Sequence, residues 1–278
     1  MNFFWAIIFV TAICLPSFGQ RVAILSPTGD VGSVEFAKAL SDSLARDLRV
    51  VDRDLTAAAY RSSRPETPYN LTIEQAKQIG SVVGCDFFVL VDSAVQRRAG
   101  LERPDYFEAY AAVFTVSSRT GRLVRFELKS AESEKENSAA GSLVKLVPEA
   151  ANSIVTAVRQ AAVSEVREPP VPPVEEVPAD GSPQAKGFRS PVPYRRVKPE
   201  YTSEAYLHNV TATVDITVDL DDKGNILRTE LTRWGGYGLD ESVIKAVTGM
   251  NWRPAERNGR ALPIRFLLRY NFKKVEKD

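Results

Sequence analysis

A stretch near the end of the chain alternates strictly between apolar and polar side chains. From Val210 to Leu220 every even-numbered residue is apolar, and every odd-numbered residue is Thr or Asp. Successive side chains of a strand point to opposite faces, so this pattern predicts a strand with one face on a core and the other in water. The C-terminal region is therefore expected to hold a sheet that buries one face.

The residues that follow predict a turn, a second strand, a helix and a closing strand. Asp222 to Asn225 favour a hairpin turn, because Gly224 takes a positive φ easily. Ile226 to Thr232 returns as the partner strand, and Leu239 to Met250 has apolar residues at helical spacing with two acids in its first turn. Ile264 to Phe272 alternates again. The predicted architecture is a small α+β (ββαβ) domain over residues 193–278.

Four short motifs in this region resemble the C-terminal domain of the TonB energy-transducer family. The resemblance covers about residues 191–272, under a third of the chain. It implies a periplasmic domain that binds partner proteins through an exposed edge strand and catalyses nothing. The motifs are Pro199–Tyr201, Leu239–Val247, Trp252–Ala255 and Asn258–Gly259.

Residues 20–165 interleave predicted strands with predicted helices. Thr72 to Gln75 has the form of a capping box that opens a helix, and Phe87 to Val91 is a continuous apolar run typical of a strand covered on both faces. A hairpin and a closing helix follow, so a mixed sheet packed with helices, an α/β domain, is expected. The layout resembles the N-terminal domain of TolB, which implies binding rather than catalysis. The motifs that carry this resemblance are Arg21–Leu25, Leu44–Asp52 and Gly84–Leu90.

Proline separates the two predicted domains. Glu168 to Pro193 contains eight prolines and no apolar periodicity. Proline feeds neither a β-ladder nor a helix interior, so residues 166–192 are expected to form an extended linker. With no apolar surface in this linker, the domains are expected to fold separately with few contacts between them.

The N-terminus predicts export. Phe3 to Leu15 is nearly all apolar but shorter than the roughly 20 residues of a spanning helix. Pro16 and the Ser17–Gly19 site that follows it favour a cleaved signal peptide over residues 1–19, and hence a periplasmic protein. The alternative is a retained inner-membrane anchor, and membrane contact is expected in that case alone.

Composition and motifs argue against catalysis and against nucleic acid. The net charge is +1, which gives no general attraction to nucleic acid. His208 is the sole histidine, so a zinc site or a Ser–His pair has little support, and a surface position is expected for it. Gly235 to Gly238 lacks the spacing of a phosphate loop and is interpreted as a flexible loop. No catalytic residue, metal or cofactor is therefore predicted, and the protein is not expected to be an enzyme.

The predicted binding surface is the edge of the closing strand. Its outward side chains are Arg265, Leu267, Arg269 and Asn271, where an incoming receptor peptide would pair. Two interpretations of the arginines stay open: they attract an acidic peptide, or they keep the edge soluble. Tyr194 and Tyr201 flank a basic stretch that is the second predicted contact surface.

The functional prediction is protein–protein coupling in the cell envelope. The TonB resemblance implies contact with an outer-membrane transport receptor or an envelope complex. The alternative is a structural scaffold that recognises cell-wall material.

Overall fold

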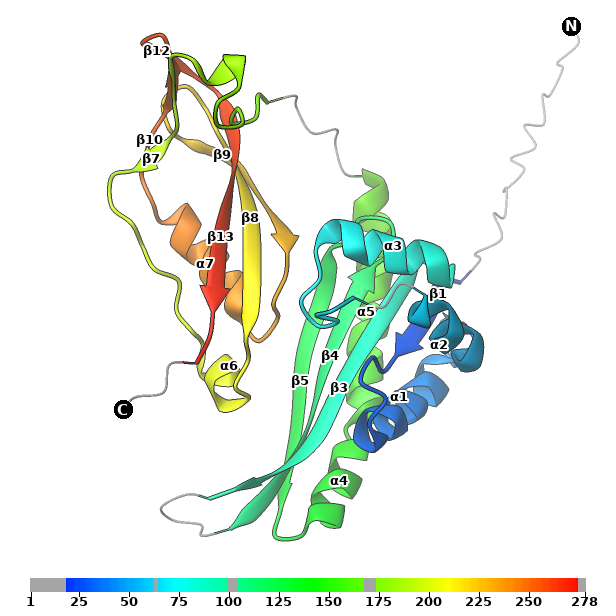
Figure 1. Ribbon diagram of the computed structural model, residues 1–278. Helices are drawn as coiled ribbons and strands as arrows, with labels where there is room; N and C mark the ends of the chain where they lie inside the picture. Colours follow the sequence, from blue (N-terminus) through cyan, green and yellow to red (C-terminus); the bar gives the residue numbers. More distant parts are fainter. Residues whose placement is uncertain (1–18, 63–64, 100–104, 168–173, 275–278) are drawn as a thin grey trace, which may run out of the picture.

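The computed structural model describes residues 19–62, 65–99, 105–167 and 174–274. The predicted signal peptide, residues 1–19, lies almost wholly outside them. Two halves stand side by side, an N-terminal half with a large sheet and a C-terminal half with smaller sheets (Figure 1). Within the described ranges, no helix has the length and apolar character needed to cross a membrane.

The N-terminal half is built on one five-stranded mixed sheet, as predicted. The strand order is β2-β1-β3-β4-β5, with β1 parallel to both of its neighbours and the last two pairs antiparallel. Parallel neighbours arise because helices connect β1 to β2 and β2 to β3, whereas only a few residues separate the later strands in the sequence. The strands are β1 (Arg21–Leu25), β2 (Arg49–Val50), β3 (Phe87–Arg98), β4 (Tyr106–Ser117) and β5 (Leu123–Ser133).

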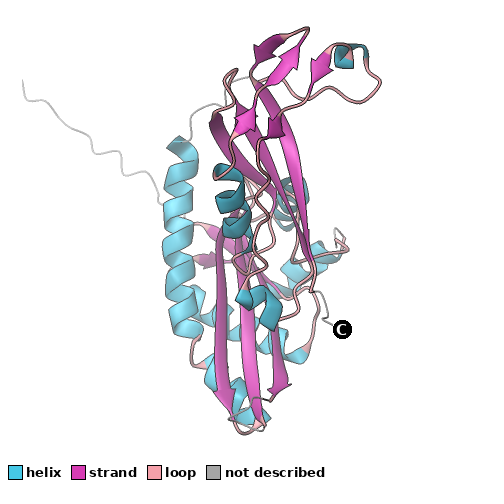
Figure 2. Ribbon diagram, turned by 90° about the vertical axis from the view of Figure 1, so that its left-hand side faces the viewer, coloured by secondary structure: helices cyan, strands magenta, loops and turns pink. Residues whose placement is uncertain are grey.

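Helices cover the two faces of this sheet unequally. One face packs against α1, α4 and α5 in a closed apolar cluster, and the long helix in Figure 2 is α5 lying along it. The other face packs against α2 and α3 and also against residues of the C-terminal half. The capping box predicted at Thr72 and Gln75 is present at the start of α3. The helices are α1 (Val31–Leu44), α2 (Arg53–Arg61), α3 (Ile73–Val83), α4 (Glu136–Val144) and α5 (Val147–Arg167).

The C-terminal half centres on the strand that the alternating pattern predicts. This strand is β8, which lies between β13 and β9 in an antiparallel sheet whose apolar face contacts α7. The Asp221–Asn225 turn joins β8 to β9, with Gly224 at φ +85°. Three short strands, β10 to β12, intervene before β13 and were not predicted. The elements are α6 (Ser203–Leu207), β8 (Ala212–Leu220), β9 (Ile226–Arg233), α7 (Leu239–Thr248), β10 (Trp252–Arg253), β11 (Ala255–Arg257), β12 (Arg260–Leu262) and β13 (Ile264–Phe272).

The prediction of an extended linker over residues 166–192 is wrong for the second half of that range. A short helical turn, η1 (Pro183–Ala185), is followed by β6 (Phe188–Arg189), which pairs with β11. Next, β7 (Val192–Pro193) pairs with β10. The prolines themselves donate no hydrogen bond, but the residues between them keep their N–H groups and join the small sheets.

The expectation of few contacts between the halves is also wrong. One apolar cluster runs through both and includes Phe88 and Phe114 of the large sheet with Val214 and Trp234 of the C-terminal half. The Trp234 indole donates to the Gly121 carbonyl oxygen at 3.2 Å, and Arg122 bonds Glu230 across the same boundary. The halves are joined by their own surfaces rather than through the linker, which is why linker composition did not reveal the contact.

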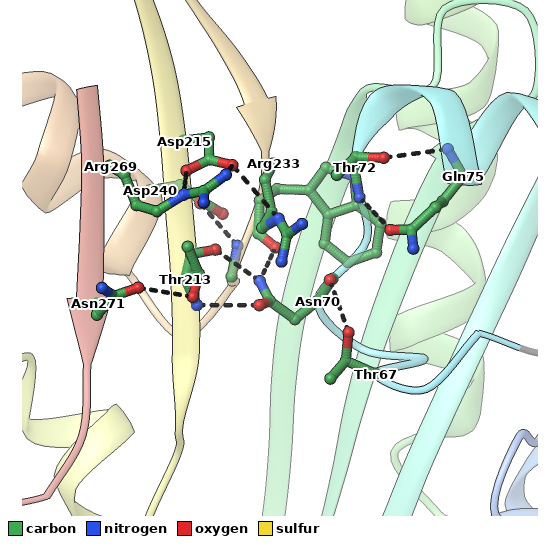
Figure 3. Close-up of polar contacts among 12 residues, drawn as sticks. Thr67, Asn70, Thr72, Gln75, Thr213, Asp215, Arg233, Asp240, Arg269 and Asn271 are labelled. Carbon is green, nitrogen blue, oxygen red and sulfur yellow. Dashed lines mark hydrogen bonds and ion pairs between the residues drawn. The ribbon is translucent and has the colours of Figure 1, made fainter. Parts of the chain in front are cut away.

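A loop of the N-terminal half continues the C-terminal sheet. Thr72 forms an antiparallel bridge with Arg233, and Trp234 N donates to the Leu71 carbonyl oxygen. Beside them the Asn70 amide lies against the backbone of Thr213, at a point where β9 no longer pairs with β8 (Figure 3). The β9 side of the sheet is thus closed by the N-terminal half.

The glycine-rich segment before α7 is buried, and the prediction of a flexible loop there is wrong. Tyr237 is 6% exposed and packs on Phe126 with ring centroids 4.8 Å apart. The Asp240 carboxylate accepts hydrogen bonds from Gly235 N and Gly236 N. These contacts hold the segment against the large sheet.

Candidate functional site

The outer edge of β13 is the open side of the C-terminal sheet. Within the described residues, β13 pairs with β8 along its whole length and forms the edge of the sheet. The backbone N–H and C=O of Arg265 point away from β8, because both bond to the linker. Backbone groups alternate in direction along an antiparallel strand, so those of Leu267, Arg269 and Asn271 point the same way. These are the four residues that the sequence predicts for the edge.

The side chains of Arg265 and Arg269 are held in ion pairs. The Arg265 guanidinium donates two hydrogen bonds of 2.6 Å to the Asp219 carboxylate. The Arg269 guanidinium donates bonds of 2.7 and 2.9 Å to the Asp215 carboxylate. The hydrogen bonds raise the pKa of both guanidinium groups. Each arginine therefore bonds a buried carboxylate of β8, and Asp215 is shared with Arg233, whose Nε lies 3.4 Å away. Three arginines thus face two carboxylates, so ion pairing holds the side chains in place without removing all of the positive charge.

Leu267, Arg269 and Asn271 are the exposed residues of this edge, and the Arg269 side chain is 55% exposed although it is ion-paired. Leu267 is 52% exposed, and Asn271 is exposed at the far end of β13. The Asn271 side chain accepts a hydrogen bond of 2.9 Å from the Thr213 hydroxyl (Figure 3). The edge therefore offers one apolar side chain between two ion-paired arginines.

The two predicted tyrosines have different roles. Tyr194 is 70% exposed, and its backbone N–H bonds the Asn251 carbonyl oxygen. Tyr201 is only half-buried, but its hydroxyl lies 2.7 Å from the Val210 carbonyl oxygen and its ring stacks on Phe272. Tyr201 thus anchors the chain around α6, and the structure does not bring it together with Tyr194 on one open surface.

A groove runs beside the open edge, on the same side of the sheet as α7. Its volume is about 470 Å³, and the chain between β7 and α6 forms its outer wall (Figure 1). The groove would receive alternate side chains of a strand added to β13, because such a strand directs every second residue to that face. Its floor is mostly apolar and includes Met250, Trp252, Phe266, Leu268 and Tyr270.

His208 is buried, so its predicted surface position is wrong. Its side chain is 1% exposed and lies against the rings of Tyr110 and Tyr237 at the boundary between the halves. Burial lowers its pKa. In the described ranges no group of three or more His, Cys, Asp or Glu side chains is placed to hold a metal ion.

A segment that sequence reasoning missed occupies one end of the edge. Glu175 to Val177 forms a parallel bridge at Arg265: Arg265 N donates to the Glu175 carbonyl oxygen at 2.7 Å, and Val177 N donates to the Arg265 carbonyl oxygen at 3.1 Å. Glu175 also pairs with Arg257. Both bridge bonds are made by the backbone, which leaves no periodic signal in so short a segment.

Comparison with known proteins supports the C-terminal prediction. Residues 197–273 match the family described as Gram-negative bacterial TonB protein C-terminal, so this part of the chain is such a domain. No curated protein matches the chain. The resemblance of residues 20–165 to the TolB N-terminal domain stays a prediction.

Several solved structures are similar to part of this chain at low sequence identity. The hypothetical protein CT253 from Chlamydia trachomatis is 16% identical with a TM-score of 0.35, over 51% of this chain and 99% of that one. Lipoprotein GNA1162 from Neisseria meningitidis is 15% identical with a TM-score of 0.34, over 49% and 99%. The LpoB C-terminal domain from Salmonella enterica is 13% identical with a TM-score of 0.29, over 41% and 82%.

Proposed function

We propose that this chain, whose residues 197–273 are a TonB C-terminal domain, is an envelope protein that binds an extended peptide of a partner protein at the outer edge of β13. The observation that carries the proposal is the row of backbone groups at Leu267, Arg269 and Asn271, which point away from β8. Such a row is a template for an added strand. The family match supports a protein partner in the Gram-negative envelope and a periplasmic position.

Binding would combine backbone pairing with side-chain recognition. The added strand bonds the outward backbone groups of β13, and every second side chain enters the groove over Trp252, Leu268 and Tyr270. Leu267 contacts the side chains of the added strand that point to the other face, where Arg265 and Arg269 are ion-paired. The proposed recognition combines backbone pairing with apolar contacts in a groove that Arg196 and Lys198 also line, and it includes no catalytic step.

Site-specific photo-crosslinking in cells tests the proposal. A benzophenone amino acid replaces Leu267 on the proposed edge or Leu227 on β9, where the leucine is 60% exposed. We expect a discrete crosslinked protein from position 267 and none from position 227. Equal products from the two positions, or none from position 267, would contradict the proposal.

A proline substitution then separates backbone pairing from side-chain contact. With the photoreactive residue at Asn271, Leu267→Pro removes one outward N–H that makes no bond to β8, whereas Leu267→Ala keeps it. We expect Leu267→Pro to abolish the crosslink and Leu267→Ala to retain most of it. Equal loss in the two variants would show that the side chain, not the backbone, carries the interaction.

A further inference from the structure

The bridge between Glu175–Val177 and β13 stops after one residue of β13. In a parallel ladder the next bonds would join Leu267 N to the Val177 carbonyl oxygen and Ala179 N to the Leu267 carbonyl oxygen, and these described residues make neither. Instead, Ser182 N turns back to the Ala179 carbonyl oxygen. The chain therefore leaves the edge just before Leu267. The linker covers the Arg265 end of the edge and leaves the remainder open.

Little holds this segment in place. Beyond the two backbone bonds, Glu175 pairs with Arg257 while 44% and 32% of their side chains stay exposed, so water screens the pair. Val177 packs against the core but is itself only half-buried. The opposite edge is closed far more firmly, by the buried Asn70 amide and by the shared core.

We propose that Glu175–Val177 is a displaceable strand that competes with the partner peptide for the Arg265 end of β13. This inference rests on the proposed function, because competition requires a partner at the same edge. The linker keeps the segment near its site at an effective concentration on the order of millimolar, so it rebinds whenever the partner leaves. A partner therefore displaces it by pairing with Leu267 to Asn271 first and then extending toward Arg265.

Amide exchange tests the strand without any partner. In the full chain we expect the Arg265 amide to be protected and the Leu267 amide to exchange quickly. Val177→Pro removes the donor to the Arg265 carbonyl oxygen, and we expect Arg265 exchange to accelerate about tenfold. Ala179→Pro is the matched control, a proline two residues away at an exposed position. Unchanged Arg265 exchange in Val177→Pro would overturn the proposal.

A charge substitution tests whether release of the segment, rather than a general effect of proline, accelerates Arg265 exchange. Glu175→Lys sets like charges against Arg257 and is expected to release the segment, whereas Asp180→Lys makes the same change of charge at an exposed residue beyond the bridge. We expect faster Arg265 exchange in the first variant alone. Equal acceleration in both would show an effect of net charge and overturn the role assigned to the Glu175–Arg257 pair.

Crosslinking from Asn271 tests the competition itself. We expect Val177→Pro to raise the yield of the partner crosslink about threefold over the unaltered chain, because a larger fraction of the molecules has the whole edge open. An unchanged yield despite faster Arg265 exchange would overturn competition. Absence of any crosslink in both proteins would overturn the proposed function, while the exchange result would still decide whether the strand forms and releases.

Discussion

The side chain of Asn70 takes the position of a missing strand beside Thr213. Its Nδ2 donates to the Thr213 carbonyl oxygen at 2.8 Å, and its Oδ1 accepts from Thr213 N at 2.9 Å. The same Nδ2 donates to the Trp234 carbonyl oxygen at 2.7 Å. One amide from the N-terminal half therefore satisfies three backbone groups of the C-terminal half.

Replacing Asn70 by Asp should destabilise the full chain by about 2 kcal/mol. A carboxylate cannot donate, so the carbonyl oxygens of Thr213 and Trp234 lose their partner and face a negative charge. Urea unfolding followed by Trp fluorescence measures the change. The control is Asn152→Asp on the exposed side of α5, where a change within about 0.5 kcal/mol is expected. Similar losses in the two variants would contradict the role assigned to Asn70.

Replacing Gly236 by Ala should destabilise the protein by about 3 kcal/mol through the boundary between the halves. Its φ is +67°, and an added Cβ would lie 2.7 Å from a Phe114 ring carbon and 2.8 Å from one of Phe126. Gly141→Ala in α4 is the control, because nothing lies within 4 Å there and alanine should stabilise the helix by about 0.5–1 kcal/mol. Thermal unfolding compares them, and a neutral Gly236→Ala would show that the halves are not packed as described.

Because of these contacts, the two halves are expected to depend on each other. Residues 21–165 and 190–278 expressed separately should each be less stable than the full chain, since each exposes part of the shared apolar cluster. Dye binding to exposed apolar surface and chemical denaturation measure this. If each fragment unfolds at the same denaturant midpoint as the full chain, the two halves are independent domains, as the linker composition predicted.

The stability contributed by Asp240 should fall as pH rises. Burial raises the pKa of Asp240 to about 7, above the ordinary value of 3.8. Hydrogen bonds from Gly235 N and Gly236 N favour the charged form and lower the pKa, but their effect is smaller than that of burial. Between these values the folded state binds more protons than the unfolded state, so the free energy of unfolding decreases with pH. Subtracting the Asp240→Asn profile from that of the unaltered chain isolates this residue among the other carboxylates. If the free energy of unfolding of the unaltered chain instead rises relative to that of Asp240→Asn between pH 5 and 7, the assignment is wrong.

Charge reversal at Arg265 should damage the fold rather than the binding edge alone. Arg265→Glu would place a carboxylate beside the buried Asp219, and Arg269→Glu would do the same beside Asp215. We expect Arg265→Glu alone to cost about 2–3 kcal/mol. Combining it with Asp219→Arg should recover part of the loss, because the pair is restored in reverse. Urea unfolding of the unaltered chain, the two single variants and the double variant measures the coupling, and strictly additive losses would contradict it.

Local patterns in the sequence predicted the elements well. The alternation of Val210 to Leu220 requires a strand, the Thr72–Gln75 capping box marks a helix start, and the turn before Asn225 needs its glycine. Each of these signals depends on residues near one another in the chain. The pattern of Ile264 to Phe272 likewise predicted which side chains of the edge face α7 and which face away.

The contacts that sequence reasoning missed join residues far apart in the chain. Asn70 precedes a predicted helix and has the composition of an ordinary loop, yet it bonds a strand that begins more than a hundred residues later. The Gly235–Gly238 segment has the composition of a flexible loop, but Asp240 bonds two of its N–H groups and Tyr237 packs on aromatic rings of the other half. The counter-charges of Arg265 and Arg269 sit on β8, where the alternating pattern suggested solvent.

The unbroken register between β13 and β8 also decides how the molecule would respond to mechanical force. Ladder bonds in an antiparallel pair run perpendicular to the strands. A pull along β13 through a bound peptide would shear every rung of the β13–β8 ladder at once, whereas a pull at right angles would unzip the rungs one after another. The far side of β8 is bonded to β9 and to Asn70, so a lengthwise load would be shared with the N-terminal half.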